Sequence, residues 1–146
     1  MDFSGLDLSG LNFSGLTLAS SNFSDTRLIK TKFFKTFLFK CNFQEANLTE
    51  ADLTTANLKE SDLSRAALEN TTLSRANFSK ANLSGARRIK ASMTFASLVG
   101  CDLTRENLTS AFLHGADLTK ANLTSATTSE INFKNAKFIG TIGYKP

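Results

Sequence analysis

The chain has few residues of the kinds that carry out chemistry, and they are widely separated. The one histidine is His114, and the two cysteines, Cys41 and Cys101, lie 60 residues apart. One histidine and two cysteines cannot provide the ligands of an ordinary zinc site. The acidic residues are dispersed, and the glycines form no phosphate-binding GxxxxGK[ST] loop. We therefore expect a protein that is not an enzyme, with no catalytic residues, no metal, no cofactor and no small-molecule substrate.

The element that positions these residues is a five-residue repeat. Every fifth position from Phe3 onward is apolar: of 29 such positions up to Gly143, 26 are Leu, Phe or Met, and the exceptions are Arg88, Thr128 and Gly143. A period of five is neither the helical period of 3.6 nor the strand period of 2. A short period along the whole chain indicates a solenoid, in which each repeat buries its apolar side against its neighbours.

One repeat is clearest in ANLTEADLTTANLKESDL, residues 46–63. A small residue stands two positions before each central Leu or Phe, an Asn or Asp stands one before it, and two variable polar residues follow. In an extended backbone, residues two apart point the same way, so the small and the central residue both face inward. Asn and Asp favour turns because their side chains bond nearby backbone groups. Each repeat is therefore expected to form a short extended side followed by a corner.

This tandem A(D/N)LXX pattern resembles the pentapeptide-repeat family over essentially the whole chain. The resemblance implies an all-β fold: a right-handed quadrilateral parallel β-helix with about 20 residues per turn. Residues 1–146 would form one domain of about seven coils of four pentapeptides. At ~4.8 Å between neighbouring strands, the rod would be roughly 34 Å long.

In such a square solenoid, residues 20 apart stack in columns. Cys41 and Cys101 would share a column but lie three coils apart, ~14 Å by strand spacing, which is too far for a disulfide. We interpret them as two buried small residues.

Both ends of the rod need closing. Four large residues take the small-residue position in the first coil: Met1, Leu6, Leu11 and Leu16. We expect residues 1–20 to plug the N-terminal mouth, with dimerisation through that end as the alternative. Residues 139–146 are expected to close the other end.

The interruptions of the repeat fall on one side of the square. Arg88 and Thr128 take central positions, and Glu106 takes a small-residue position. Arg88 and Glu106 would lie one coil apart. Because an unpaired buried charge is very costly, either they form an inward ion pair or the backbone bulges outward near residues 86–91.

The surface carries more information about function. The net charge is +4, and the four sides sum to roughly −2, 0, +3 and +3, with the two basic sides adjacent. The segment RLIKTKFFKTFLFK, residues 27–40, adds outward aromatic residues to this basic surface. The candidate partner surface consists of Phe34, Phe37, Phe39, Lys32, Lys35, Lys40, Phe95 and Phe112. Exposed aromatic residues beside basic ones mark interaction sites, although isolated exposed apolar residues are also common.

The favoured function is a non-catalytic protein-interaction scaffold that binds a protein partner or a second copy of itself. Family resemblance also implies a DNA mimic that protects DNA gyrase. A mimic must reproduce phosphate charge, and the basic sides have the opposite sign. Weak nucleic-acid binding through these sides is a third possibility, interrupted by Asp52, Glu60 and Asp117. No apolar run approaches the roughly 18 residues of a membrane span, so we expect a soluble cytoplasmic protein with no membrane partner.

Overall fold

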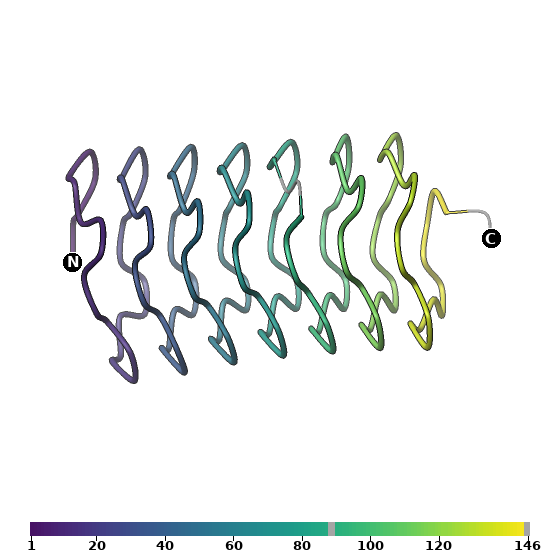
Figure 1. The fold of residues 1–146 in the computed structure, drawn as a ribbon, viewed down its shortest axis with the longest axis horizontal. Coiled ribbons are helices and arrows are strands. Elements are labelled where there is room, and N and C mark those ends of the chain that lie inside the picture. The colour runs from purple at the N-terminus through teal and green to yellow at the C-terminus, as the bar shows by residue number, and fades with distance from the viewer. Residues whose placement is uncertain (88–89, 145–146) are drawn as a thin grey trace.

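The chain winds as one long rod around a single axis (Figure 1). The structure is a computed structural model that describes residues 1–87 and 90–144. Its parallel β-bridges run from Asp2↔Asn22 to Asn122↔Ile142, and every one joins residues 20 apart. These described residues form isolated bridges, with no longer strand and no helix. The spacing confirms that residues 20 apart stack, so each turn of the rod takes four pentapeptides.

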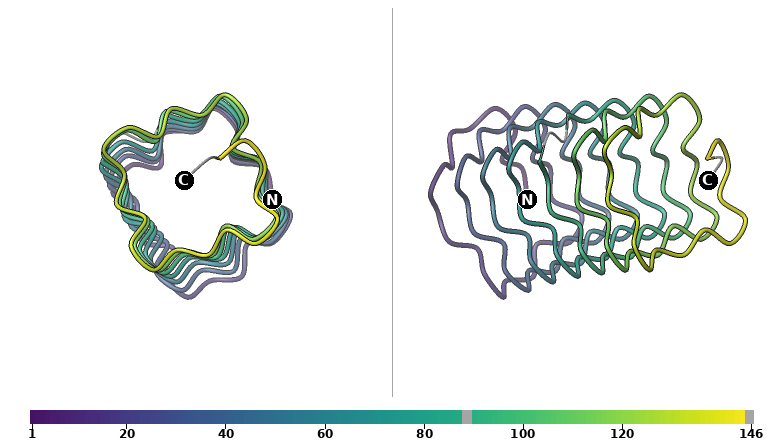
Figure 2. Two further views of the ribbon diagram at one scale, coloured as in Figure 1. Left: turned by 90° about the vertical axis from the view of Figure 1, so that its right-hand side faces the viewer. Right: turned by 45° about the vertical axis from the view of Figure 1, so that its right-hand side comes forward.

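We use these repeats to name positions. Residues 1–20 are coil 1, residues 21–40 are coil 2, and so on along the chain. The four pentapeptides of a coil are faces 1 to 4 in order, so that face 3 begins with residues 11–15 and face 4 with residues 16–20. Seen along the axis, the coils superimpose as a four-cornered tube (Figure 2).

Each corner is a tight turn fixed by two hydrogen bonds. The Asn or Asp before the central residue accepts the backbone N–H two residues on, as Asp52 does from Thr54 (2.9 Å). The central carbonyl then accepts the N–H three residues on, as Phe33 does from Thr36 (3.1 Å). The residue between, Lys35, has a φ of 56°. A positive φ at the third residue is the signature of a type II turn, and it recurs at nearly every corner.

The interior consists of stacked apolar columns. Phe3, Phe23 and Phe43 stack with successive centroids 4.8 Å apart. The rings of Phe23 and Phe33, on neighbouring columns, meet edge-on at 6.0 Å and 84°. Phe23, Phe33 and Phe43 are fully buried. Stacked and edge-on ring pairs are both favourable geometries, and these phenylalanines lie in the core columns of faces 1 and 3 in coils 1 to 3.

Polar residues at the inward small position are satisfied by the backbone. Thr36 Oγ1 donates to the carbonyl of Phe13 (2.8 Å), and Ser61 Oγ donates to that of Leu38 (2.7 Å). Both acceptors lie 23 residues earlier, on the preceding coil. A buried hydroxyl without a partner would cost about 1–3 kcal/mol, so this recurring bond explains why Ser and Thr replace Ala inside the rod.

The two ends differ. In coil 1, Leu6, Leu11 and Leu16 remain about half exposed and Met1 more so. At the other end the chain turns inward (Figure 2), and the Tyr144 ring stacks on Phe138 with centroids 4.5 Å apart. Gly143 has a φ of 77°, and a side chain there would collide with the backbone of Leu123 and Thr124. The inward turn therefore depends on glycine at this position.

Candidate interaction edge

His114, Cys41 and Cys101, the residues most capable of chemistry, lie on different coils or different faces of the rod. Among the described residues, no three His, Cys, Asp or Glu side chains come together as metal ligands. Cys41 and Cys101 are buried, and each donates a hydrogen bond to a carbonyl 23 residues earlier. Burial raises the pKa of Cys41 to about 11. A thiol that stays protonated at neutral pH is a poor nucleophile.

Glu106 lies inside the rod, where most repeats have a small residue. It is buried, and its Oε1 accepts the backbone N–H of Ala86 at 2.8 Å. Its expected partner, Arg88, lies outside the described residues, so the ion pair and the outward bulge both stay predictions. Glu106 therefore contacts the preceding coil through this hydrogen bond to Ala86.

The aromatic residues of coil 2 extend from Phe34, at the corner between faces 3 and 4, across face 4 to Phe39 at its far corner. Phe34 and Phe37 are each 40% exposed, and Phe39 is partly buried. Phe37 and Phe39 flank the inward Leu38, so their rings lie on the same outer surface with centroids 6.1 Å apart. These three phenylalanines form one outward cluster.

Lysines lie over this cluster. The Nζ of Lys35 is 5.1 Å from the centroid of Phe34, and that of Lys40 is 5.2 Å from the centroid of Phe39. Both distances are within the range of a cation–π contact. Lys32, also predicted for this surface, is exposed on face 3. The cluster therefore presents aromatic and positive surface together.

A second aromatic cluster lies on coils 5 and 6. Phe95 is 52% exposed and Phe112 is 51% exposed. Phe95 meets His114 edge-on at 5.2 Å, and the Arg75 guanidinium lies 6.0 Å from its ring centroid. The Phe95 ring lies directly over Gly115, where an added Cβ would collide with it. Glycine at position 115 therefore makes room for the exposed ring.

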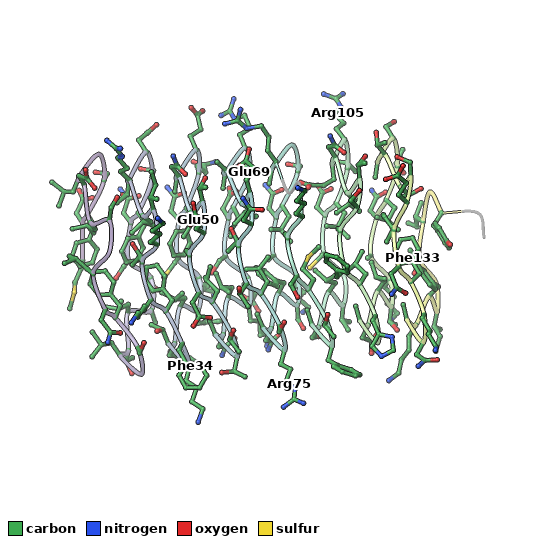
Figure 3. All side chains as sticks on the ribbon, viewed as in Figure 1. Phe34, Glu50, Glu69, Arg75, Arg105 and Phe133 are labelled. Carbon is green, nitrogen blue, oxygen red and sulfur yellow. The ribbon has the colours of Figure 1, made fainter. Side chains whose placement is uncertain are left out.

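Both clusters lie along one edge of the rod. Lys35, Arg75, Phe95 and Gly115 occupy the same corner column, where face 3 meets face 4, because their numbers differ by multiples of 20. Figure 3 shows Phe34 and Arg75 projecting from the same side of the rod. We call this line the aromatic edge. It consists of Phe34, Lys35, Phe37, Phe39, Arg75, Phe95 and His114.

Sequence reasoning found most of this edge but not its link between clusters. The sequence predicts Phe34, Phe95 and Lys35 for this surface but does not connect Arg75 or His114 with them. The 20-residue column that contains Arg75, Phe95 and Gly115 could have shown that they lie together. Phe112 lies on face 3, two residues before His114, and so flanks the edge.

Positive charge is least compensated along face 3. The ion pairs among the described residues include three on face 4: Lys40 to Glu60, Lys59 to Glu60, and Lys137 to Asp117. None of them lies on face 3. The two cations at the corner of face 3, Lys35 and Arg75, instead lie over the rings of Phe34 and Phe95. The basic character predicted for two sides is therefore strongest on face 3.

The edge protrudes rather than forming a pocket. One side hollow of the described structure, about 420 Å³, is lined by Ser64, Arg65, Gly85, Arg105 and their neighbours on face 1. A second, about 400 Å³, lies at the C-terminal end beside Phe133 and Tyr144. Neither includes a residue of the aromatic edge. The geometry is suited to contact with a broad surface, not to enclosing a small molecule.

The family profile for pentapeptide repeats matches eight copies, over residues 2–33, 38–75, 61–105, 89–124 and 116–142. The chain belongs to the pentapeptide-repeat family. Proteins of this family form right-handed β-helices and generally serve as structural or interaction scaffolds. The comparison with curated proteins found no match. No helix in the described part of this pentapeptide-repeat protein has the length and apolar character needed to cross a bilayer.

Two solved structures with TM-scores above 0.5 agree on the fold. The alr5209 pentapeptide repeat protein from Nostoc PCC 7120 is 31% identical, over 66% of this chain and 83% of that chain, with a TM-score of 0.58. Full-length QnrB1, a plasmid-mediated fluoroquinolone resistance protein, is 15% identical, over 97% and 92%, with a TM-score of 0.53. HetL, a regulator of heterocyst differentiation from the cyanobacterium Nostoc sp. PCC 7120, is 26% identical over 97% and 86%, with a TM-score of 0.35.

Proposed function

We propose that this protein is a non-catalytic interaction scaffold, a square rod of about seven coils that binds a protein partner through its aromatic edge. The observation that carries the proposal is the exposure of Phe34, Phe37 and Phe95 on a single edge, beside Lys35 and Arg75. Aromatic and arginine residues are enriched at the centres of protein interfaces. The partner surface should offer apolar recesses and acidic groups.

The interior supports a scaffold rather than an enzyme. Core side chains fill the tube from coil to coil, and the two hollows described above contain no residue of the aromatic edge. The aromatic edge is held on a backbone fixed by repeated bridges. A rigid surface loses little conformational entropy on binding.

The edge can be tested by triple substitution. Phe34/Phe37/Phe39→Ser should leave folding intact and remove binding, since these side chains face outward. The matched control is Val99→Ser/Ile139→Ser, which changes outward apolar residues on face 4 in the same column as Phe39 but on coils 5 and 7, outside the cluster of coil 2. Quantitative affinity capture from extracts of the source organism should show partners retained by wild type and the control but not by the triple variant. Equal retention by all three would contradict the proposal.

The gyrase alternative is tested separately. The lysines and the arginine of face 3 are positively charged, whereas a DNA mimic must reproduce the negative charge of phosphates. We therefore expect no effect of this protein on gyrase. A supercoiling assay with and without quinolone checks this, and protection of gyrase at micromolar protein would overturn it. Binding to DNA that falls steeply with salt would instead favour the nucleic-acid alternative.

The proposal also places the scaffold in the cytoplasm. Cys41 is a buried thiol outside any disulfide, as is usual for a cysteine in a reducing compartment. Fractionation of the source cells would test the location.

A further inference from the structure

Coil 1 carries a ring of large apolar side chains at the N-terminal end of the rod. The small inward position holds Met1, Leu6, Leu11 and Leu16, one on each face. Met1 is 76% exposed, and the three leucines are 47–49% exposed. Equivalent residues inside the rod, such as Ala46 and Ala56, are fully buried. The departure from the repeat therefore places four large apolar groups at an end that the structure leaves uncovered.

The backbone at this end is also unpaired. In coil 2, the N–H of Asn22 donates to Met1 O (2.9 Å), and its carbonyl accepts from the Phe3 N–H (2.8 Å). The equivalent groups of coil 1 point away from the rod. They belong to Asp2, Asp7, Asn12 and Thr17, and no hydrogen bond between described residues uses their backbone N–H or C=O. Each face thus ends in a free sheet edge, which favours pairing with another chain.

The opposite end of the rod does not match this edge. Tyr144 packs against Phe133 and Phe138 across the C-terminal end, with ring centroids 5.1 and 4.5 Å away. A second copy stacked head to tail would have to displace this segment. The N-terminal edge can instead pair with itself, because a residue that points both its N–H and its C=O outward can exchange both bonds with an antiparallel counterpart.

We propose that two copies of this chain dock through their N-terminal ends, about a two-fold axis perpendicular to the rod. The apolar side chains of coil 1 from the two copies meet at the centre of the contact, and the free backbone edges pair as antiparallel strands around them. Such an isologous contact is closed, so it forms a dimer and not a filament. This surface is separate from the aromatic edge, and each dimer presents two copies of that edge.

The charges of coil 1 select one register. Asp2 is on face 1 and Asp7 on face 2, whereas faces 3 and 4 carry the neutral Asn12 and Thr17. An axis through the corner between faces 2 and 3 sets Asp7 opposite Asn12 and Asp2 opposite Thr17. Every other two-fold arrangement of the square sets two aspartates opposite each other, and like charges directly opposite are destabilising. Leu11, the first residue after that corner, then lies near its own copy.

The contact is small. Three extended residues at ~3.3 Å each, with corners and outward side chains, make the end about 20 Å across. Two such ends would bury on the order of 800 Å² in total, which is below the ~1,000 Å² that a stable specific interface should exceed. We therefore expect a reversible dimer with a dissociation constant on the order of micromolar or weaker.

Sedimentation velocity and light scattering over about 1–500 µM protein test this dimer directly. The expected mass rises from 15.9 kDa to twice that value with concentration. Leu6→Asp/Leu11→Asp should remain monomeric, while the control Ile139→Asp, a 72% exposed residue near the other end, should dimerise like wild type. A wild type that stays monomeric throughout, or a dimer lost in the control and kept in the leucine variant, would overturn the proposal.

A cysteine variant tests the same contact independently of whether the aspartate variant folds. Leu11→Cys should form a disulfide-linked dimer on mild oxidation, whereas Ile139→Cys should not. Absence of the Leu11→Cys dimer at concentrations where wild type self-associates would overturn the proposed register and axis. The Phe34/Phe37/Phe39→Ser variant should dimerise normally, so failure of the scaffold proposal and failure of this one give different results.

Discussion

The phenylalanines of this protein fall into two sets that share a side chain but not a role. Eight lie on the five-residue frame, and five lie off it at outward positions. Phe33 is fully buried, and Phe34, its neighbour in sequence, is 40% exposed. Because one step along an extended backbone reverses the direction of the side chain, a single residue separates a core position from a binding position. The inward set explains stability, and we assign recognition to the outward set.

The largest expected effect is on the inward set. Phe33→Ala removes a buried ring that contacts Phe13, Phe23 and Phe43, and large-to-small changes of this kind cost about 3–5 kcal/mol. Chemical denaturation would measure the loss. A loss below about 1 kcal/mol would mean that the column repacks freely and would contradict the assignment of stability to it.

An inward carboxylate gives the next effect. Glu106→Ala removes one of the two acceptors of the Ala86 N–H, the other being the Leu83 carbonyl, and with it any pairing to Arg88. Because the lost hydrogen bond is to a carboxylate, we expect a loss of about 1–3 kcal/mol. Thermal unfolding checks this, with Glu106→Gln as the variant that keeps the size and the acceptor oxygen. A melting temperature unchanged in Glu106→Ala would exclude the predicted ion pair.

Gly115→Ala tests the position of an outward phenylalanine, Phe95. Its φ is 67°, and the new Cβ would collide with the Phe95 ring. A non-glycine residue with positive φ costs roughly 1 kcal/mol, and the ring must move off its place between Arg75 and His114. The measurements are the free energy of unfolding and the chemical shifts of the His114 ring. Unchanged shifts would mean that the ring does not occupy this place in solution.

The outward cluster should matter little for folding. Phe34/Phe37/Phe39→Ser replaces side chains that are partly solvated, so we expect a loss of about 1 kcal/mol or less. The same denaturation experiment applies, with Val99→Ser/Ile139→Ser as the control. A loss as large as that of Phe33→Ala would show that the cluster is part of the core and would break the comparison.

Outward carboxylates give the smallest effect. Hydrogen bonds from Thr119 lower the pKa of Asp117 below its ordinary value. Its contribution to stability is therefore present above about pH 4 and is lost as pH falls through the lowered pKa. Asp117→Asn, which keeps the turn acceptor, should have nearly wild-type stability at pH 7 and a slightly flatter acid profile of melting temperature. An identical acid profile would show that the charge of Asp117 contributes nothing.

The sequence predicts the fold more completely than the site because every repeat has the same pattern of inward apolar and outward polar residues. The inward positions of Ala46, Leu48 and Ala51 follow from spacing alone, since period, burial and corner chemistry agree. The outward positions are not constrained by packing, so the contact of Phe95 with Arg75, His114 and Gly115 depends on side-chain conformations that a one-dimensional pattern does not encode. Counting in steps of 20 recovers which residues are neighbours. It does not recover that the Phe95 ring lies across Gly115.

The most direct test of the central claim is quantitative affinity capture with immobilised wild type and the Phe34/Phe37/Phe39→Ser variant, compared in parallel after both are shown to be folded. The account predicts that proteins retained by wild type fall at least about tenfold on the variant, a change of about 1.4 kcal/mol in binding. The same retained proteins in the same amounts on both would contradict it.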